Sequence, residues 1–333
     1  MHSGSKIIKR DLRLINKKLL TIAARADRFV PGIKEHLLTG GKKIRPSLLM
    51  LAFRIFRSKE RNSYLKQALN YGAVIEMFHN ASLLHDDVIE GSNLRRGKQT
   101  INSLYGNKKA VLSGDLLTAF SMSLLYNLES SKTIEQINRI IGRAARELVQ
   151  GEIEEVTGLF KVTISEKEYL RVITGKTAGL FMAAAEAGAV LAQANKEQTR
   201  AMKEYGRNFG IAFQIVDDIL DFTGAEDKLG KPVASDLLEG KLTLPVIDAL
   251  KKADRKEKKK ISDILLLVRN GKKVKDGTRY IVAILKKYDS LNSAFEKAEV
   301  YVNKSLAALK KLPKNEFRDA LEKTAAFTLD RNY

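Results

Sequence analysis

The stretch Tyr71–Glu90 reads YGAVIEMFHNASLLHDDVIE, and it shows the pattern that decides the fold: an apolar helical run that ends in acidic residues. Apolar side chains recur in it at steps of three and four residues, which places them on one face of an α-helix. The same period dominates nearly the whole sequence, which has only 5 prolines and no convincing strand-like alternation. The sequence therefore predicts an all-α fold.

Predicted helices cover most of the chain, with ends placed to within about 2–4 residues. Ser165 followed by Glu168 has the pattern of a capping box at a helix start. Loops are expected at 40–41, 91–97 and 223–240, where glycine and charged residues gather. Because no stretch has the composition of an interdomain linker, we expect one domain over 1–333. The helices are expected at 6–24, 45–56, 64–90, 110–127, 134–157, 166–191, 197–222, 242–251, 276–287, 291–310 and 316–328.

Composition limits the classes of protein that this chain can be. The 333 residues are 44% hydrophobic, which is enough for a substantial core. No run approaches the roughly 20 consecutive apolar residues that cross a bilayer, and the first residues lack the apolar segment of a secretory signal. These features predict a soluble, cytoplasmic protein. The absence of cysteine and the presence of only 4 histidines mean that a metal ion would be held by oxygen.

The formal net charge of +20 favours anionic partners: nucleic acid, an acidic membrane surface or phosphorylated small molecules. Much of the charge lies in runs such as 251–260, which are typical of the solvent-exposed side of a helix. We therefore assign the surface charge no specific role.

The first acidic cluster, formed by Asp86, Asp87 and Glu90, lies at the end of the opening stretch. Asp86 and Glu90 are four residues apart and share a helix face, where like charges repel. A helix C-terminus is also unfavourable for anions, so the arrangement costs stability unless a cation is bound. Taken alone, this cluster is equally compatible with a solvated acidic helix end.

A second cluster, formed by Asp217, Asp218 and Asp221, repeats this geometry after another apolar helical run. Two such clusters in one chain weaken the interpretation as solvated helix ends. Carboxylates without histidine or cysteine suit Mg2+, which often bridges one or two carboxylates to the phosphates of a substrate. The sequence therefore predicts bound Mg2+ and a substrate that carries a diphosphate.

Basic residues accompany both clusters. Arginine offers a planar fork to phosphate oxygens, lysine offers a compact charge, and glycine lets backbone N–H groups approach closely. Together such residues could bind two phosphorylated groups. They are Lys42, Lys43 and Arg45 in GGKKIRP, Arg95 and Arg96 in LRRG, and Lys228, Lys231 and Lys241 after the second cluster.

In these residues and their order the chain resembles the trans-isoprenyl diphosphate synthases, also called polyprenyl synthetases, and in particular the medium- and long-chain members. The resemblance spans most of the chain. Its ordered motifs are GGKKIRP at Gly40, HNASLLHDDVIEGSNLRRGKQT at His79, LSGD at Leu112, QGE at Gln150, GKTAGLF at Gly175, FQIVDDILDFTG at Phe213 and GKLTLP at Gly240.

The resemblance implies a single-domain, isoprenoid-synthase-type helical bundle around a central cavity, usually as a homodimer, with the two acidic motifs facing each other. It implies a Mg2+-dependent prenyltransferase that condenses isopentenyl diphosphate with an allylic diphosphate to an all-trans polyprenyl diphosphate. Nucleic acid is not expected as a partner, and membrane contact is expected to be peripheral at most.

Residue roles follow from the same resemblance, motif by motif. The metal-binding set would be Asp86, Glu90 and Asp217 as direct ligands, supported by Asp87, Asp218 and Asp221. Isopentenyl diphosphate would be held by Lys42, Arg45, His79 and Arg96. The allylic diphosphate would be held by Arg95, Lys176, Lys231 and Lys241, with Thr177 and Gln214 beside the developing cation. The catalytic group would comprise Asp86, Asp87, Asp217, Asp218, Lys176, Thr177 and Gln214.

Two departures from the family pattern are visible. The family's first motif usually has aspartate at its fifth position, where this chain has Glu90, which keeps the ligand type but adds a methylene group. We expect the metal geometry to adjust to it. The family's short basic motif at the C-terminus is also not evident, because the sequence ends Asp330-Arg331-Asn332-Tyr333.

Product length should depend on the depth of an apolar tunnel below the first cluster. Ala81 and Ser82 lie five and four positions before Asp86, on the turn beneath the metal site. Ordinary close helix packing explains such small residues equally well. In the family, a bulky aromatic residue at these positions closes the tunnel and limits the enzyme to short products. Its absence here favours a product of six to ten isoprene units. Met77, Phe78, Phe120 and Met122 are candidates for a deeper floor.

Other functions remain open from the sequence. A shorter-chain farnesyl or geranylgeranyl diphosphate synthase has the same motifs, and a non-catalytic subunit of a heteromeric synthase has the same fold. A terpene cyclase or head-to-head condensing enzyme would not need the second diphosphate pocket that GGKKIRP and LRRG imply. A basic nucleic-acid-binding module would need an aromatic and basic motif that the chain lacks.

Overall fold

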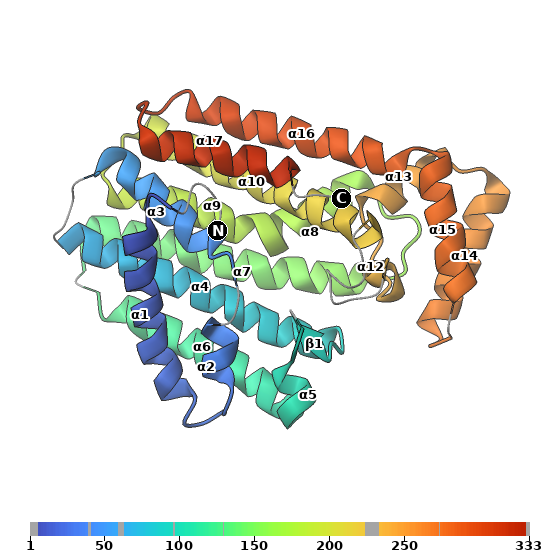
Figure 1. Ribbon diagram of the computed structural model, residues 1–333, viewed down its shortest axis with the longest axis horizontal. Coiled ribbons are helices and arrows are strands. Elements are labelled where there is room, and N and C mark those ends of the chain that lie inside the picture. Colours follow the sequence, from blue (N-terminus) through green and yellow to red (C-terminus); the bar gives the residue numbers. More distant parts are fainter. Residues whose placement is uncertain are drawn as a thin grey trace. The chain divides into compact units, whose positions relative to one another are not determined.

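In the computed structural model the described residues are 6–38, 41–58, 63–95, 97–128, 130–223, 233–272 and 274–330. Apart from two strands of two residues each, the regular structure of these residues is helical, which confirms the all-α prediction (Figure 1). Helices in the first half are α1 (Lys9–Ala26), α2 (Ile33–Leu38), α3 (Ile44–Phe56), α4 (Ser63–Ile89), α5 (Ile101–Tyr105), α6 (Asn107–Tyr126) and α7 (Lys132–Gly158).

The second half continues with helices. They are α8 (Glu166–Ile173), the π-helix η2 (Thr174–Ala178), α9 (Gly179–Leu191), α10 (Lys196–Thr223), α12 (Ser235–Leu238), α13 (Leu244–Lys252), α14 (Arg255–Arg269), α15 (Lys275–Lys287), α16 (Ser290–Leu309) and α17 (Glu316–Leu329). The predicted capping box is confirmed at the start of α8, where Ser165 and Glu168 bond to each other's backbone N–H groups.

The contacts between residues divide the chain into two compact units. The first unit comprises Met1–Ala145, Leu180–Arg207 and Ser305–Phe327, and the second comprises Arg146–Gly179, Asn208–Lys304 and Thr328–Tyr333. Each unit therefore collects segments that are far apart in the sequence. The prediction of one domain over 1–333 stays a prediction.

The first unit is built around α4, which packs against α1, α3 and α6 (Figure 1). Nearly every side chain of α4 from Ala68 to Met77 is buried, which explains why this helix has a continuous apolar run instead of one apolar stripe. One core cluster below its C-terminal half joins α1, α2, α5 and α6, and its members are Ala23, Ala26, Val30, Ile33, Leu37, Ala81, Leu84, Ile101, Ala110 and Leu117.

The second unit has its own core, centred on the C-terminal half of α10. Ile215, Val216 and Ile219 of α10 are fully buried in one cluster with side chains from α8, α13, α14 and α15. Asp217 and Asp218 lie between these apolar positions, so the packing of α10 determines which of the carboxylates is buried.

The ends of the predicted helices agree with the structure to within 3 residues, but several elements differ from the prediction. The expected helix over 166–191 is interrupted by η2, and the expected loop at 91–97 contains β1 (Leu94–Arg95), which pairs with β2 (Lys98–Gln99). Helices α2, α5 and α12 were too short to give a periodic signal. Helix α14 was also omitted, although the interpretation of its lysines as a solvent-exposed helix face is confirmed.

Candidate active site

The first acidic cluster has one buried and two half-buried carboxylates. The side chain of Asp87 is 1% exposed, and its Oδ1 accepts a hydrogen bond of 2.6 Å from Nε of Arg95. Nη2 of Arg95 also lies 4.0 Å from Oε2 of Glu90. Asp86 and Glu90 are half-buried at the end of α4. A cation of the protein thus already faces the buried side of this cluster.

A tight hairpin carries Arg95 back to the end of α4. Helix α4 is followed by Gly91 in the left-handed region at φ 65, and Gly97 at φ 75 lets the chain turn between β1 and β2. Nδ2 of Asn102 donates to the carbonyl oxygens of Asp87 (3.2 Å) and Ser92 (3.0 Å). Arg95 is therefore held against the first cluster by the turn of the hairpin and by the side chain of Asn102.

The second acidic cluster is held by neutral donors. Asp218 is buried, and it accepts hydrogen bonds from Oη of Tyr169 (2.5 Å) and Nε2 of Gln214 (2.8 Å). Gln214 in turn accepts a hydrogen bond of 2.7 Å from Oγ1 of Thr177. Burial, followed by the charge of Asp236, raises the pKa of Asp218 well above its ordinary value. Thr177, Gln214 and Asp218, which come from two motifs far apart in the sequence, therefore form one network.

Asp221 closes the other side of the second cluster. Its Oδ1 accepts from the backbone N–H (3.1 Å) and Oγ (2.6 Å) of Ser235, and its Oδ2 accepts from N–H of Asp236 (3.2 Å). These bonds tie the end of α10 to the start of α12. Asp217 is half-buried on α10, as Asp221 is. The direct metal contact that the resemblance gives to Asp217 stays a prediction.

Two predicted diphosphate-binding lysines lie together in the second unit. Nζ of Lys176 lies 2.5 Å from Oε2 of Glu155 and 2.7 Å from Oε2 of Glu152. Nζ of Lys241 lies 2.7 Å from Oε2 of Glu239 and 3.8 Å from Oε2 of Glu155. The structure therefore brings these two lysines to one shared carboxylate.

The π-helix explains how Lys176 reaches α7. Single π-turns inserted between α-helices are frequent at functional sites. A Cβ added at Gly151 of α7 would lie 2.5 Å from the backbone nitrogen of Lys176, and one at Gly175 would lie 2.8 Å from the carbonyl oxygen of Glu147. The QGE and GKTAGLF motifs thus meet backbone to backbone, and only glycine permits this approach.

The remaining predicted binding residues that are described lie in the first unit. The exposed Lys42 places Nζ 5.8 Å from the ring centroid of Phe327, and the guanidinium of Arg45 lies 4.2 Å from that of Phe181. His79 is half-buried on α4. Arg96 and Lys231 lie outside the described residues. The neighbouring Lys43 pairs with Glu76 at 2.9 Å, so this lysine of GGKKIRP is structural.

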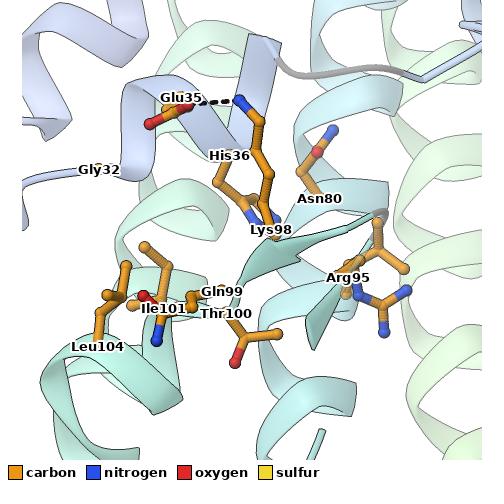
Figure 2. Close-up of a pocket in the computed structure, with 11 residues that line it drawn as sticks. Gly32, Glu35, His36, Asn80, Arg95, Lys98, Gln99, Thr100, Ile101 and Leu104 are labelled. Atoms are coloured by element: carbon orange, nitrogen blue, oxygen red, sulfur yellow. Dashed lines mark hydrogen bonds and ion pairs between the residues drawn. The ribbon is translucent and has the colours of Figure 1, made fainter. Parts of the chain in front are cut away.

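The first unit also contains a pocket of about 390 Å³ beside the first cluster (Figure 2). Figure 2 shows Arg95 and Asn80 on one side of it and the α2 residues Glu35 and His36 on the other. Lys98 of β2 pairs with Glu35 near its rim. Arg95 therefore contacts both the acidic cluster and this pocket.

The candidate chain-length residues lie on α4 one turn before the first cluster. Ala81 is 2% exposed and belongs to the core cluster against which Phe120 packs, whereas the Oγ of half-buried Ser82 donates to the carbonyl oxygen of His79. Of the candidate floor residues, Met77 is fully buried, Phe78 is half-buried and Met122 is 50% exposed.

The donor chemistry of both clusters fits a hard divalent cation, because every candidate ligand is a carboxylate oxygen. No three acidic or histidine side chains converge on a common metal position within the part of the chain that the structure describes. Mg2+ keeps several waters and uses one or two protein carboxylates together with substrate phosphates. Asp86 with Glu90, and Asp217, would supply such partial coordination.

Several residues of the site gave no sufficient signal in the sequence. Tyr169 is 49 positions before Asp218 and belongs to no quoted motif. Glu152 lies inside QGE, and Glu155 follows it by three residues on the same helix face, a spacing that could have identified it. His85 contacts α6 instead of acting within the cluster, with Nε2 3.2 Å from the carbonyl oxygen of Val111.

An all-α fold with two carboxylate clusters at helix ends, each near basic side chains, defines a class of helical enzymes that act on anionic substrates. The model of the polyprenyl synthetase family matches residues 28–284. The chain belongs to this family, as the motifs predicted.

Individual relatives agree with this assignment. The chain is 34% identical over 332 residues to the octaprenyl diphosphate synthase of Haemophilus influenzae, covering 98% of this chain and 96% of that one. A decaprenyl diphosphate synthase from Rhodobacter capsulatus has a similar structure, with a TM-score of 0.87, 32% identity and 98% of both chains covered. The polyprenyl synthase from Caulobacter crescentus complexed with calcium and isoprenyl diphosphate gives the same TM-score and identity, covering 99% of this chain and 98% of that one.

These comparisons confirm the predicted enzyme class, a prenyltransferase of the polyprenyl diphosphate synthase type. The predicted all-α fold is confirmed with it. Among the described residues, no helix is long and apolar enough to cross a membrane.

Proposed function

We propose that the protein condenses isopentenyl diphosphate with an allylic diphosphate in the presence of Mg2+, and that its product is an all-trans polyprenyl diphosphate of six to ten isoprene units. The observation that carries this proposal is the repeated arrangement of the two acidic clusters. In each, one buried carboxylate is fixed by the protein while half-buried carboxylates remain at the helix end.

The chain's own residues support each part of the reaction. Arg95, Lys176 and Lys241 would bind the allylic diphosphate, and their charges would favour breakage of the bond between its carbon and oxygen. Mg2+, when bound by the acidic clusters, would neutralise charge on the departing diphosphate. Gln214, oriented between Thr177 and Asp218, would keep the Thr177 side chain beside the developing allylic cation.

The second substrate supplies the electrons for the new bond. Lys42, Arg45, His79 and Arg96 would hold isopentenyl diphosphate so that its double bond attacks the allylic cation. A carbon–carbon bond then forms, and a proton passes to the departing diphosphate. The product is an allylic diphosphate longer by one isoprene unit, and no protein nucleophile is needed.

Product length is proposed from two observations. Relatives of this chain are named octaprenyl and decaprenyl diphosphate synthases. Ala81 places only a methyl group one turn below the first cluster, at a position where the family resemblance implies that a bulky aromatic residue would limit the product to a short length. A farnesyl or geranylgeranyl diphosphate synthase is the alternative that the assay below distinguishes.

A homodimer and a cytoplasmic location complete the proposal. Helix α6 exposes Val111, Leu112, Met122 and Tyr126, which lie within one stripe of about 100° on the helix. A second copy of the chain would remove this apolar stripe from water. Sedimentation equilibrium would give twice the chain mass if the dimer forms. The absence of cysteine suits a reducing compartment, and cell fractionation would test the location.

The function is tested by incubating the purified protein with Mg2+, labelled isopentenyl diphosphate and allylic primers of several lengths. Chromatography against chain-length standards should reveal products of six to ten units. Products of three or four units would support the short-chain alternative. Failure to extend any primer, with a chelator-treated sample as the blank, would contradict the proposed catalysis and favour a non-catalytic subunit.

A further inference from the structure

Five charged side chains of the second unit form one compact group, which we call the lysine–glutamate cluster: Lys176, Lys241, Glu152, Glu155 and Glu239. Their side chains are between 12% and 21% exposed, so all five are largely shielded from water. Three carboxylates face two ammonium groups. The cluster is therefore net negative at neutral pH, although two of its members are proposed to bind a diphosphate.

Glu155 occupies a special place in the cluster because both lysines approach it. Its Oε2 lies 2.5 Å from Nζ of Lys176 and 3.8 Å from Nζ of Lys241. Glu152 and Glu239 each pair with only one of these lysines in the contacts above. Within these pairings, the removal of the Glu155 charge would act on both ammonium groups at once.

The charge of Glu155 also acts on Tyr169, the hydrogen-bond partner of Asp218 in the second acidic cluster. Burial is the main reason why the pKa of Tyr169 is raised, and the charges of Asp218, Asp236 and Glu155 raise it further. Tyr169 donates its hydrogen bond to Asp218. Glu155 therefore adds to the negative potential that Asp218 and Asp236 create at Tyr169.

Resting on the function proposed above, we propose that Glu155 makes diphosphate binding at Lys176 and Lys241 depend on a divalent cation. Without the cation, the carboxylate of Glu155 occupies the two ammonium groups and repels an incoming diphosphate. With the cation bound, the negative field is offset, and the phosphate oxygens replace Glu155 at the lysines. Glu155 would thus select the metal-bound form of the substrate over the free anion.

The neighbouring Glu154 provides a matched control. It lies on the same turn of α7, but its carboxylate pairs with Arg171 at 2.8 Å, and these two side chains are 40% and 65% exposed. An exposed ion pair contributes little to binding or stability. Glu154→Gln therefore makes the same chemical change next to Glu155 without altering the charge beside the lysines.

The test measures binding of inorganic diphosphate by calorimetry in the presence of a chelator. Glu155→Gln should bind it at least about 10-fold more tightly than wild type, which corresponds to about 1.4 kcal/mol. Glu154→Gln should stay within about 2-fold of wild type. Addition of Mg2+ should tighten binding much more for wild type than for Glu155→Gln. Equal affinities of Glu155→Gln and Glu154→Gln without metal would overturn the proposal.

Two further measurements keep the outcome interpretable. If Glu155→Gln does not fold, as judged by circular dichroism, Glu239→Gln should show a smaller tightening in the same direction, and no tightening there would overturn the proposal. Primer extension by wild type tests the proposed function separately. Active wild type with no effect of Glu155→Gln would contradict only the role of Glu155, whereas inactive wild type would contradict the function.

Discussion

The two acidic clusters share one pattern of acidic and apolar residues, HDDVIE and VDDILD, but have different surroundings. In both, the second aspartate is buried and the first is half-buried. Asp87 is paired with the guanidinium of Arg95, whereas Asp218 is bonded to the neutral side chains of Tyr169 and Gln214. The protein therefore pairs a cation with the buried aspartate of the first cluster and neutral donors with the buried aspartate of the second.

This difference shows that two copies of one acidic motif can lie in different electrostatic environments. The helix end and the spacing of the carboxylates are encoded locally, but the partners come from a hairpin in one unit and from α8 in the other. The second cluster, with Asp236 nearby, is therefore expected to depend more on a bound cation for its stability.

The largest expected effects come from removing the half-buried aspartates. Asp86→Ala and Asp217→Ala should each lower kcat by at least about 10²-fold, because each removes a carboxylate that would position a cation at the departing diphosphate. Primer extension at saturating Mg2+ measures the loss, and circular dichroism should show an unchanged helical fold. The control is Asp276→Ala, since the side chain of Asp276 is 98% exposed on α15.

Removal of the metal should have the same effect as these substitutions. A chelator should abolish turnover by wild type, and added Mg2+ should restore it. If both alanine variants keep near-normal activity, the assignment of the acidic clusters as metal sites is wrong.

A second prediction tests whether the residues below the first acidic cluster determine the length of the product. Below the first cluster Ala81 packs in a core cluster of alanine and aliphatic side chains, whereas the equivalent position and its neighbour below the second cluster are Ala212 and Phe213. Ala81→Phe should shorten the product while the first condensation is largely retained, because the ring would block a tunnel beside α4. Chromatography of the products measures the change. An unchanged product length would place the tunnel elsewhere.

The sequence predicted the carboxylates of the two acidic clusters and the lysines near the second, but neither Glu155 nor the pairs that these side chains form. Asp87 and Arg95 belong to one motif, and their contact is close to what the motif suggests. The bond between Tyr169 and Asp218 spans 49 residues, and no local pattern encodes it. The contact between Lys176 and Glu155 depends on the π-helix, whose extra residue per turn cannot be recognised from a helical period.

The fold shows the same limit. The long helices α4, α7 and α10 were predicted because their apolar residues repeat over many turns. The hairpin of β1 and β2 consists of two residues on each side, too few for an alternating pattern. How the two units are arranged is also not encoded in any local spacing, so the facing of the two acidic motifs stays a prediction.

A third prediction compares how much the protein partners of the two buried aspartates contribute to the free energy of unfolding. Arg95→Met should lower the free energy of unfolding by about 2–3 kcal/mol, because it leaves the buried carboxylate of Asp87 without its cation. Tyr169→Phe should cost about 1–2 kcal/mol, since Asp218 keeps the bond from Gln214. Urea unfolding followed by circular dichroism measures both. A larger loss for Tyr169→Phe would mean that the second cluster, not the first, depends more on its protein partner.

The last prediction concerns two glycines: Gly114, which packs against His85 next to the first acidic cluster, and Gly151, which packs against Lys176. A Cβ at Gly151 would meet the backbone of Lys176 at 2.5 Å, whereas a Cβ at Gly114 would meet only the imidazole of His85. The side chain of His85 is 35% exposed and can rotate, but the backbone of η2 cannot move without disturbing Lys176. Gly151→Ala should therefore cost about 1–3 kcal/mol. Gly114→Ala should cost less than about 1 kcal/mol, because the gain in helix propensity offsets part of the clash.

Gly142→Ala is the reference for these two substitutions, since a Cβ at this exposed position of α7 meets no atom within 4 Å. It should stabilise the protein by up to about 1 kcal/mol through helix propensity alone. Thermal unfolding of the three variants, compared at one temperature, separates propensity from contact. If Gly151→Ala is as stable as Gly142→Ala, the backbone of η2 can move away from α7 at little cost. The pairing of Lys176 with Glu155 would then not need the close backbone approach.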